Sequence, residues 1–272
     1  MAIEFKRETE FSKLLNPGDN FAEKIFPIEF RTDPLTKDRG IVVEFRLRKS
    51  EKTDLSQLVA KSLEMPCPFC SEAVDKATPK FLPDFCTEGR IKLGEAIVFP
   101  NALPFMPYSA LTILTSKHFV GLTEFTEDML VDAFLASQTY FKTTQEHDSG
   151  AKYCCIMWNY MPPANSSQIH PHLQLIAGHF PLAYHENLVE ASRKYIAKNG
   201  TNYWSDFIAE EKRLGERYIA TLGNTVWLTS FVPRASLLDV LAIFQGSQSF
   251  LSLPREDIES FCHGLTKIFK YM

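Results

Sequence analysis

Apolar residues gather along the chain in short stretches that predict strands, with helical patterns between them. Residues 96–101 and 109–115 are apolar and strand-forming, and residues 153–159 and 168–177 predict two further strands. A helical pattern opens at Thr126-Glu127-Asp128 and runs toward Phe141, with Thr126 as the expected N-cap. Strands in succession around a helix are typical of an α+β fold.

The last part of the chain starts the same order again. Residues 186–218 predict a charged, amphipathic helix that is broken near Asn199 and Gly200. Strands follow at 226–232 and 238–244, and a helix opens at Pro254. This order echoes residues 109–141, so we predict two α+β halves, residues 1–185 and 186–272, with chance similarity as the alternative.

Composition excludes several classes of protein. The 272 residues are 45% hydrophobic and 23% charged, as in globular proteins, which excludes a disordered, collagenous or coiled-coil chain. The net charge of -4 supplies no general field for nucleic acid. No apolar run approaches the roughly 20 residues of a membrane span, and the first residues lack the apolar stretch of a signal peptide. We therefore expect neither nucleic acid nor membrane as a partner, and a cytoplasmic location.

The richest candidate chemistry lies in residues 168–174, Gln-Ile-His-Pro-His-Leu-Gln. On an extended strand His170, His172 and Gln174 would project from one face, because alternate residues share a face. A neutral imidazole can bind a metal or attack an electrophile, and an amide can stabilise a developing oxyanion. The alternative is a solvated strand face, although such faces favour Thr, Lys and Glu. Asn159 and the Asn165-Ser166-Ser167 loop add neutral donors that could hold phosphate. The alternative is that this segment is a loop without a binding role.

Two of the six cysteines, Cys67 and Cys70, have the spacing that lets two thiolates bind one tetrahedral zinc. They lie in a proline-rich stretch, residues 65–83, that predicts an ordered loop. No second pair of this kind completes the site, so His118 and His170 are the candidates for the remaining ligands. A pair of thiols without metal is the alternative. The other cysteines are interpreted as core residues, and His147, His179, His185 and His263 as surface or satisfied histidines.

Together these motifs resemble the galactose-1-phosphate uridylyltransferase family, the two-repeat branch of the histidine-triad superfamily. The resemblance extends over most of the chain and is carried by a set of short motifs: Arg31 to Thr36, Cys67-Pro68-Phe69-Cys70, Ala77-Thr78-Pro79, Val98 to Asn101, Thr115 to His118, Trp158-Asn159, Ser167 with His170 to Gln174, Glu211 to Arg217, and Trp227 to Pro233. It implies two histidine-triad-like repeats, each an antiparallel sheet packed with helices. The first, residues 1–185, would hold the zinc loop and the active site, and residues 186–272 a connecting helix and a shortened second repeat.

The resemblance also implies a reaction, a transfer of a nucleoside monophosphate between a nucleotide sugar and a sugar 1-phosphate. His172 would attack the α-phosphorus and carry the nucleotide covalently until a second phosphate acceptor collects it. Gln174 would stabilise the phosphoryl oxygens. The implied binding residues are Asn159 and Ser167 for phosphate, Phe99 and Asn101 for base and ribose, and Arg46 as a further nucleotide or phosphate contact. The implied ligands of one structural zinc are Cys67, Cys70, His118 and His170.

Departures from the family pattern keep other functions open. Leu173, in His-Pro-His-Leu-Gln, is more similar to diadenosine tetraphosphate phosphorylases, which favours adenylyl transfer or phosphorolysis on ADP-glucose or diadenosine tetraphosphate. Residues 244–253 contain no histidine, so we expect no second metal. The sequence stops at Met272, where uridylyltransferases continue through segments that hold the hexose, which weakens the expectation of galactose metabolism. A non-catalytic nucleotide-binding paralogue is the third hypothesis. The family is often dimeric, so a homodimer is among the expected partners.

Overall fold

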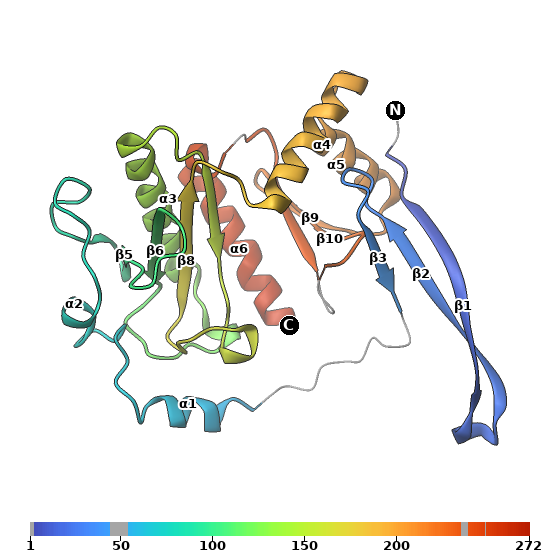
Figure 1. The fold of residues 1–272 in the computed structure, drawn as a ribbon, viewed down its shortest axis with the longest axis horizontal. Coiled ribbons are helices and arrows are strands. Elements are labelled where there is room, and N and C mark those ends of the chain that lie inside the picture. The colour runs from blue at the N-terminus through green and yellow to red at the C-terminus, as the bar shows by residue number, and fades with distance from the viewer. Residues whose placement is uncertain (1–2, 44–53, 235–238, 248) are drawn as a thin grey trace. The chain divides into compact units, whose positions relative to one another are not determined.

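A computed structural model describes residues 3–43, 54–234, 239–247 and 249–272. The chain forms two compact units, each built from two separate stretches of sequence (Figure 1). Unit 1 comprises residues 1–52 and 183–245, and unit 2 comprises residues 53–182 and 246–272. The division into repeats at residue 185 is a different partition of the chain and stays a prediction.

Unit 2 is centred on a five-stranded antiparallel sheet in the order β4-β5-β6-β8-β7. Its strands are β4 (Ile91–Leu93), β5 (Ala96–Pro100), β6 (Tyr108–Ile113), β7 (Tyr153–Met157) and β8 (His172–Gly178). The turn between β4 and β5 requires glycine, because Gly94 has a φ of 55° and a Cβ there would lie 1.7 Å from Asp132 Oδ2.

The long helix α3 (Glu127–His147) covers one face of this sheet, and α6 (Arg255–Tyr271) packs against α3 (Figure 1). The predicted cap is confirmed, since Thr126 Oγ1 accepts a hydrogen bond from the Met129 amide. Thr112 of β6 and Ser137 of α3 share a hydrogen bond of 2.9 Å between their hydroxyls. The face of the sheet that α3 covers is therefore the one from which the Thr112 side chain projects.

The remaining elements of unit 2 are short and surround the sheet. They are α1 (Ser56–Ser62), α2 (Val74–Ala77), η3 (Leu122–Glu124), η4 (Pro162–Ala164) and η5 (Phe250–Ser252). The predicted loop over residues 65–83 is confirmed apart from the single turn of α2.

Unit 1 contains two three-stranded antiparallel sheets and two helices. Its elements are β1 (Lys6–Asn16), η1 (Pro17–Asp19), β2 (Ala22–Thr32), β3 (Arg39–Val42), α4 (Ala183–Asn199), α5 (Tyr203–Leu214), β9 (Tyr218–Leu222), β10 (Thr225–Thr229) and β11 (Val240–Phe244). The predicted helix break is confirmed between α4 and α5. Phe207 of α5 and Leu228 of β10 belong to one buried cluster, which joins helix to sheet.

The fold class is α+β with antiparallel sheets, as predicted. The β1–β2 hairpin was not predicted, and the strand expected over 168–177 begins only at His172. Pro171 has no amide hydrogen to donate to a ladder, and its carbonyl accepts from the Leu114 amide at the last point of pairing. Within the described residues, no helix is long and apolar enough to cross a membrane.

Candidate active site and metal cluster

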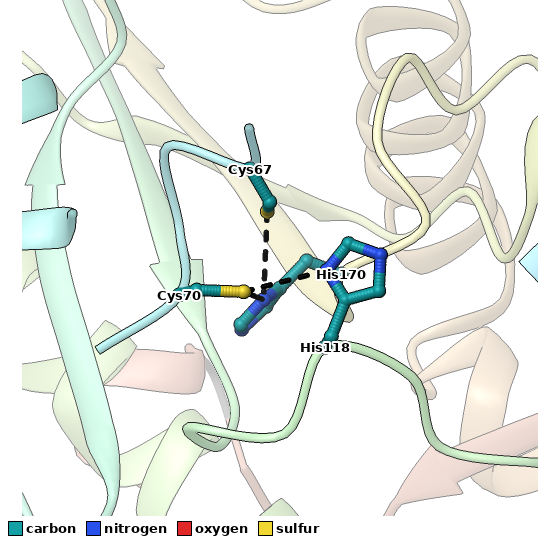
Figure 2. Close-up of side chains that lie close together, drawn as sticks. All are labelled: Cys67, Cys70, His118 and His170. Atoms are coloured by element: carbon teal, nitrogen blue, oxygen red, sulfur yellow. Dashed lines mark hydrogen bonds between the residues drawn. The ribbon is translucent and has the colours of Figure 1, made fainter. Parts of the chain in front are cut away.

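Four side chains from three parts of unit 2 converge on one point (Figure 2). Cys67 and Cys70 come from the loop after α1, His118 follows β6, and His170 precedes β8. One ligand atom from each residue lies within 4.8 Å of the others. The structure therefore brings together the four residues that the sequence grouped as metal ligands.

Hydrogen bonds orient both imidazoles toward the thiols. His170 Nε2 donates to the Thr115 carbonyl over 2.8 Å, which leaves Nδ1 facing the cysteines. His118 Nε2 lies 2.9 Å from Ser62 Oγ, and because that hydroxyl donates to the Val59 carbonyl it accepts from His118. Both rings thus carry their proton on Nε2 and present the lone pair of Nδ1, as ligating histidines do.

The donor set fits a tetrahedral zinc ion. Zn–S bonds of about 2.3 Å and Zn–N bonds of about 2.0 Å place sulfur and nitrogen ligands roughly 3.5 Å apart. Cys70 Sγ lies 3.4 Å from His118 Nδ1 and 3.8 Å from His170 Nδ1, and Cys67 Sγ lies 3.8 Å from His170 Nδ1. The cluster could therefore hold a metal ion, with two thiolates and two imidazoles as ligands.

Burial sets the protonation of two residues of the cluster. Burial, together with the neighbouring Cys67 thiol, raises the pKa of Cys70 to about 11. Burial lowers the pKa of His170 to about 4, so its ring is neutral at pH 7. The neutral ring of His170 can bind a metal as it stands, whereas the Cys70 thiol would give up its proton to a divalent cation, as thiol ligands do.

His172 lies directly beside this cluster, as the first residue of β8. Its ring is 5% exposed, and its Nδ1 lies 2.9 Å from the His170 carbonyl. A carbonyl only accepts hydrogen bonds, so Nδ1 carries the proton and the lone pair is on Nε2. Burial lowers the pKa of His172 below its usual range, which keeps the ring neutral.

The face of the sheet that carries His172 is the one opposite α3. Leu173 pairs with Thr112, whose hydroxyl bonds to α3, so Leu173 points toward the helix and its neighbours point away. His172 and Gln174 therefore share the outer face, two residues apart, as predicted. Leu173 is fully buried on the helix side, so this difference from the family pattern concerns packing against α3.

The strand registers place more of the predicted residues on this face. Phe99 pairs with Leu111, and Leu111 pairs with Gln174, so Phe99 and Gln174 lie in one row across three strands. The β7–β8 ladder ends at the pair of Met157 and Gln174, and Asn159 follows two residues beyond the end of β7.

The other predicted binding residues lie in more varied settings. Phe99 is 1% exposed and belongs to a buried cluster on the outer face, where Phe69 and Val74 cover it. Asn101 follows β5, and its Oδ1 accepts from the Leu103 amide. Ser167 is exposed, whereas neighbouring Ser166 is buried and donates to the Gln168 carbonyl. Arg46 lies outside the described residues. The binding roles of this set stay predictions.

Phe69 and Ser62 are parts of the site that the sequence analysis missed. The ring of Phe69 contacts both His170 and His172, with centroid distances of 6.0 Å and 5.4 Å. Its position between the two cysteines was a signal that could have singled it out. Ser62 is the last residue of α1, and its contact with His118 joins residues 56 positions apart in the sequence, so no local sequence signal identifies it.

Arg90 anchors the loop that carries the cysteines. Its guanidinium is buried, and it donates to the carbonyls of Val74, Thr78 and Pro79 and to Asp75. The same group lies 5.7 Å from the centre of the Phe99 ring. Arg90 thus ties the segment after Cys70 to the sheet.

Comparisons with known proteins agree with this architecture. No protein-family model matches the chain. A protein of Archaeoglobus fulgidus, described as an uncharacterized protein, is 30% identical over 272 residues, covering 99% of this chain and 78% of its own length. The chain belongs to the same family as this archaeal protein.

Solved structures define the fold class further. An ADP-glucose phosphorylase from Arabidopsis thaliana, with ADP-glucose bound, superposes with a TM-score of 0.65 at 16% identity, covering 88% of this chain and 75% of that one. A GalT-like protein from Arabidopsis thaliana gives the same TM-score and identity, covering 88% and 74%. A uridylyltransferase gives a TM-score of 0.59 at 14% identity, covering 87% and 72%. The chain shares the fold of these proteins, which agrees with the resemblance that the motifs indicated.

Proposed function

We propose that this protein is a nucleotidyltransferase that works through a covalent nucleotidyl-His172. The observation that carries the proposal is the state of the His172 ring: Nδ1–H is committed to the His170 carbonyl, and Nε2 has the free lone pair. An imidazole so arranged is a nucleophile whose developing positive charge a fixed carbonyl dipole stabilises.

The reaction proceeds in two displacements at one phosphorus. Nε2 of His172 bonds to the α-phosphorus of a nucleotide sugar while the bond from that phosphorus to the bridging oxygen breaks. The sugar phosphate leaves with the bonding electrons, and as a phosphate it needs no proton from the protein. A phosphate oxygen of the acceptor then attacks the same phosphorus, the N–P bond breaks, and His172 returns to its neutral form.

Other residues of the outer face would support these steps. Gln174 lies two positions along β8 from His172, about 7 Å away at strand spacing, where its amide can donate to a phosphoryl oxygen. Asn159, two residues beyond the end of β7, would be the second neutral donor. Cys67, Cys70, His118 and His170 would hold one zinc, which supplies a structural tie between loop and strand rather than a reacting group.

The proposal leaves a choice between two kinds of nucleotide donor. A nucleotide sugar with a sugar 1-phosphate acceptor is our first choice, as in uridylyltransferases. Adenylyl transfer or phosphorolysis is the second, supported by the fold that the chain shares with an ADP-glucose phosphorylase. Both choices use the same His172 chemistry.

Intact-mass analysis tests the chemistry and identifies the base together. The purified protein is incubated in turn with UDP-glucose, ADP-glucose, UTP, ATP and diadenosine tetraphosphate. We expect one nucleotide-sized mass increase on the parent with its preferred donor, and none on His172→Ala. His179→Ala is the matched control, because His179 also adjoins β8 but at the far end, and it should label like the parent.

An adduct on His172→Ala would assign the nucleophile elsewhere and contradict the proposal. A parent that forms no adduct with any donor, yet gains thermal stability from nucleotides, would favour a non-catalytic nucleotide-binding protein.

A further inference from the structure

Phe69 occupies an unusual position between the metal cluster and the proposed nucleophile. It stands between Cys67 and Cys70 in sequence, and its side chain is 8% exposed. Its ring meets the His172 ring edge-on, with centroids 5.4 Å apart and planes at 65°. It meets the His170 ring at 6.0 Å and 89°. One side chain of the loop therefore touches both a metal-ligand candidate and the candidate nucleophile.

The position of Phe69 is itself fixed from several sides. Its ring lies 5.6 Å from that of Phe99, and it packs in one buried cluster with Val74, Leu111 and Ile113. Ile113 is also the residue that pairs with His172 across the β6–β8 ladder. The loop is held at one end by the Cys2His2 cluster and at the other by Arg90, so Phe69 transmits the placement of the loop to the outer face of the sheet.

His172 needs such a support. The hydrogen bond from Nδ1 to the His170 carbonyl fixes the tautomer, but a single bond leaves the ring free to rock about its side-chain torsions. An aromatic edge packed beside the ring restricts that motion and excludes water from one side of it. Displacement of a reacting group by 1 Å reduces rates by about 100-fold.

We propose that Phe69 is a positioning residue for His172. Its ring holds the imidazole in the orientation for attack, and the loop that it shares with Cys67 and Cys70 makes this orientation depend on the metal cluster. The proposal rests on the function proposed above and adds to it a physical link between a structural metal and the nucleophile.

Phe69→Leu is the test variant, because it keeps the site apolar and removes the flat edge. Phe69→Tyr restores an aromatic ring. Phe134→Leu is the matched control, since Phe134 in α3 is 9% exposed and packs against Phe250 and Phe261, away from the outer face. Metal content and thermal stability are measured on every variant.

The kinetic readout is the rate of adduct formation in single turnover over a range of donor concentrations. Phe69→Leu should lower the rate at saturating donor by about 10- to 100-fold, with less than about threefold change in the half-saturating concentration, because binding is retained and alignment is lost. Phe69→Tyr should recover most of the rate, and Phe134→Leu should keep it even if it is less stable.

Metal removal gives the second arm. Chelation should slow the parent to about the rate of Phe69→Leu, and should slow Phe69→Leu little further, because both changes break the same link. Fully additive effects would overturn the dependence on the metal cluster.

A readout independent of turnover comes from side-chain ¹⁵N NMR. The Nδ1–H signal of His172, protected in the parent, should broaden or shift in Phe69→Leu and remain in Phe134→Leu. An unchanged signal together with an unchanged rate would overturn the positioning role. A parent without any adduct would overturn the proposed function, while the NMR comparison would still decide whether Phe69 positions the ring.

Discussion

The two ends of β8 carry histidines with opposite surroundings. At the first end His172 is buried, bonded to a backbone carbonyl and adjacent to the cluster of thiols and imidazoles. At the other end, directly after β8, the His179 side chain is 55% exposed and its Nε2 lies 2.6 Å from Asp148 Oδ2. The comparison shows the effect of environment, because both residues are histidines and they stand at opposite ends of the same strand.

The partners of the two rings determine what each can do. A carbonyl partner in a buried place fixes one tautomer and keeps the ring neutral, which leaves Nε2 as a nucleophile. A carboxylate partner accepts a hydrogen bond from Nε2 of His179, so this nitrogen has no free lone pair to offer. Asp148 also accepts from the Tyr108 hydroxyl and the Gly150 amide, so the far end forms a surface hydrogen-bond network.

The largest effect expected on the difference between His172 and His179 comes from removing one ligand of the Cys2His2 cluster. Cys70→Ala should lower bound metal from about one per chain to near zero, and adduct formation at His172 should fall with it, because a tetrahedral site loses a ligand. Metal analysis and intact mass measure the two. Cys86→Ala is the control, since Cys86 donates to the Arg90 carbonyl outside the cluster. If Cys70→Ala kept its full metal content, the Cys2His2 cluster would not be the metal site, and a bound metal there could not explain the difference between His172 and His179.

A smaller effect should follow from removing the hydroxyl that orients His118. Ser62→Ala leaves all four ligands in place but deletes the acceptor of the His118 Nε2 proton, so metal affinity should fall about 10- to 100-fold. Competition with a coloured chelator measures this affinity. Ser56→Ala, in the same helix and bonded to Asp54, should bind metal like the parent. Equal affinities in both variants would exclude a role for Ser62 in orienting the ligand.

The smallest effect belongs to the exposed end. The hydrogen bond from His179 first, and then those from the Gly150 amide and the Tyr108 hydroxyl, hold the pKa of Asp148 below its usual range. A carboxyl with a lowered folded-state pKa stabilises the fold above its unfolded pKa of about 3.9, and this stability is lost as the pH falls through the folded value. Asp148→Asn should therefore lower the Tm slightly at pH 7 and less at about pH 3.

Glu146→Gln removes one charge from the last turn of α3, two residues before Asp148, and serves as the control for this comparison. A Tm difference for Asp148→Asn that stays constant from neutral to acid pH would mean that the network does not depend on the carboxylate charge. The label on His172 should be unaffected by either variant.

Local sequence was a good guide to elements and a poor guide to where they meet. The cap at Thr126, the helix break before Tyr203 and the strands β5, β6 and β7 followed from residue pattern alone. The β1–β2 hairpin did not follow from the pattern, because charged residues occur on both of its faces. Its sequence signal is limited to the turn residues Asn16-Pro17-Gly18-Asp19.

The site shows the same limit. The spacing of Cys67 and Cys70 indicates only half of a tetrahedral set. His118 and His170 were candidates for the other half, and the resemblance implied all four as one set. Phe69 and Ser62 act through contacts with residues about 100 and 56 positions away, which no local pattern encodes. The placement of His170 before β8, rather than on it, depends on the missing amide of Pro171.

The interleaving of the two units has a consequence for how the protein is made. The four candidate metal ligands lie between residues 67 and 170, so a ribosome releases the complete set long before it releases α6. Until α6 arrives, the surface of α3 that receives it, including Phe134 opposite Phe261, has no cover. The nascent chain would thus expose an apolar helix surface until its last residues are made, and exposed apolar surface of this kind makes partly folded chains prone to aggregation.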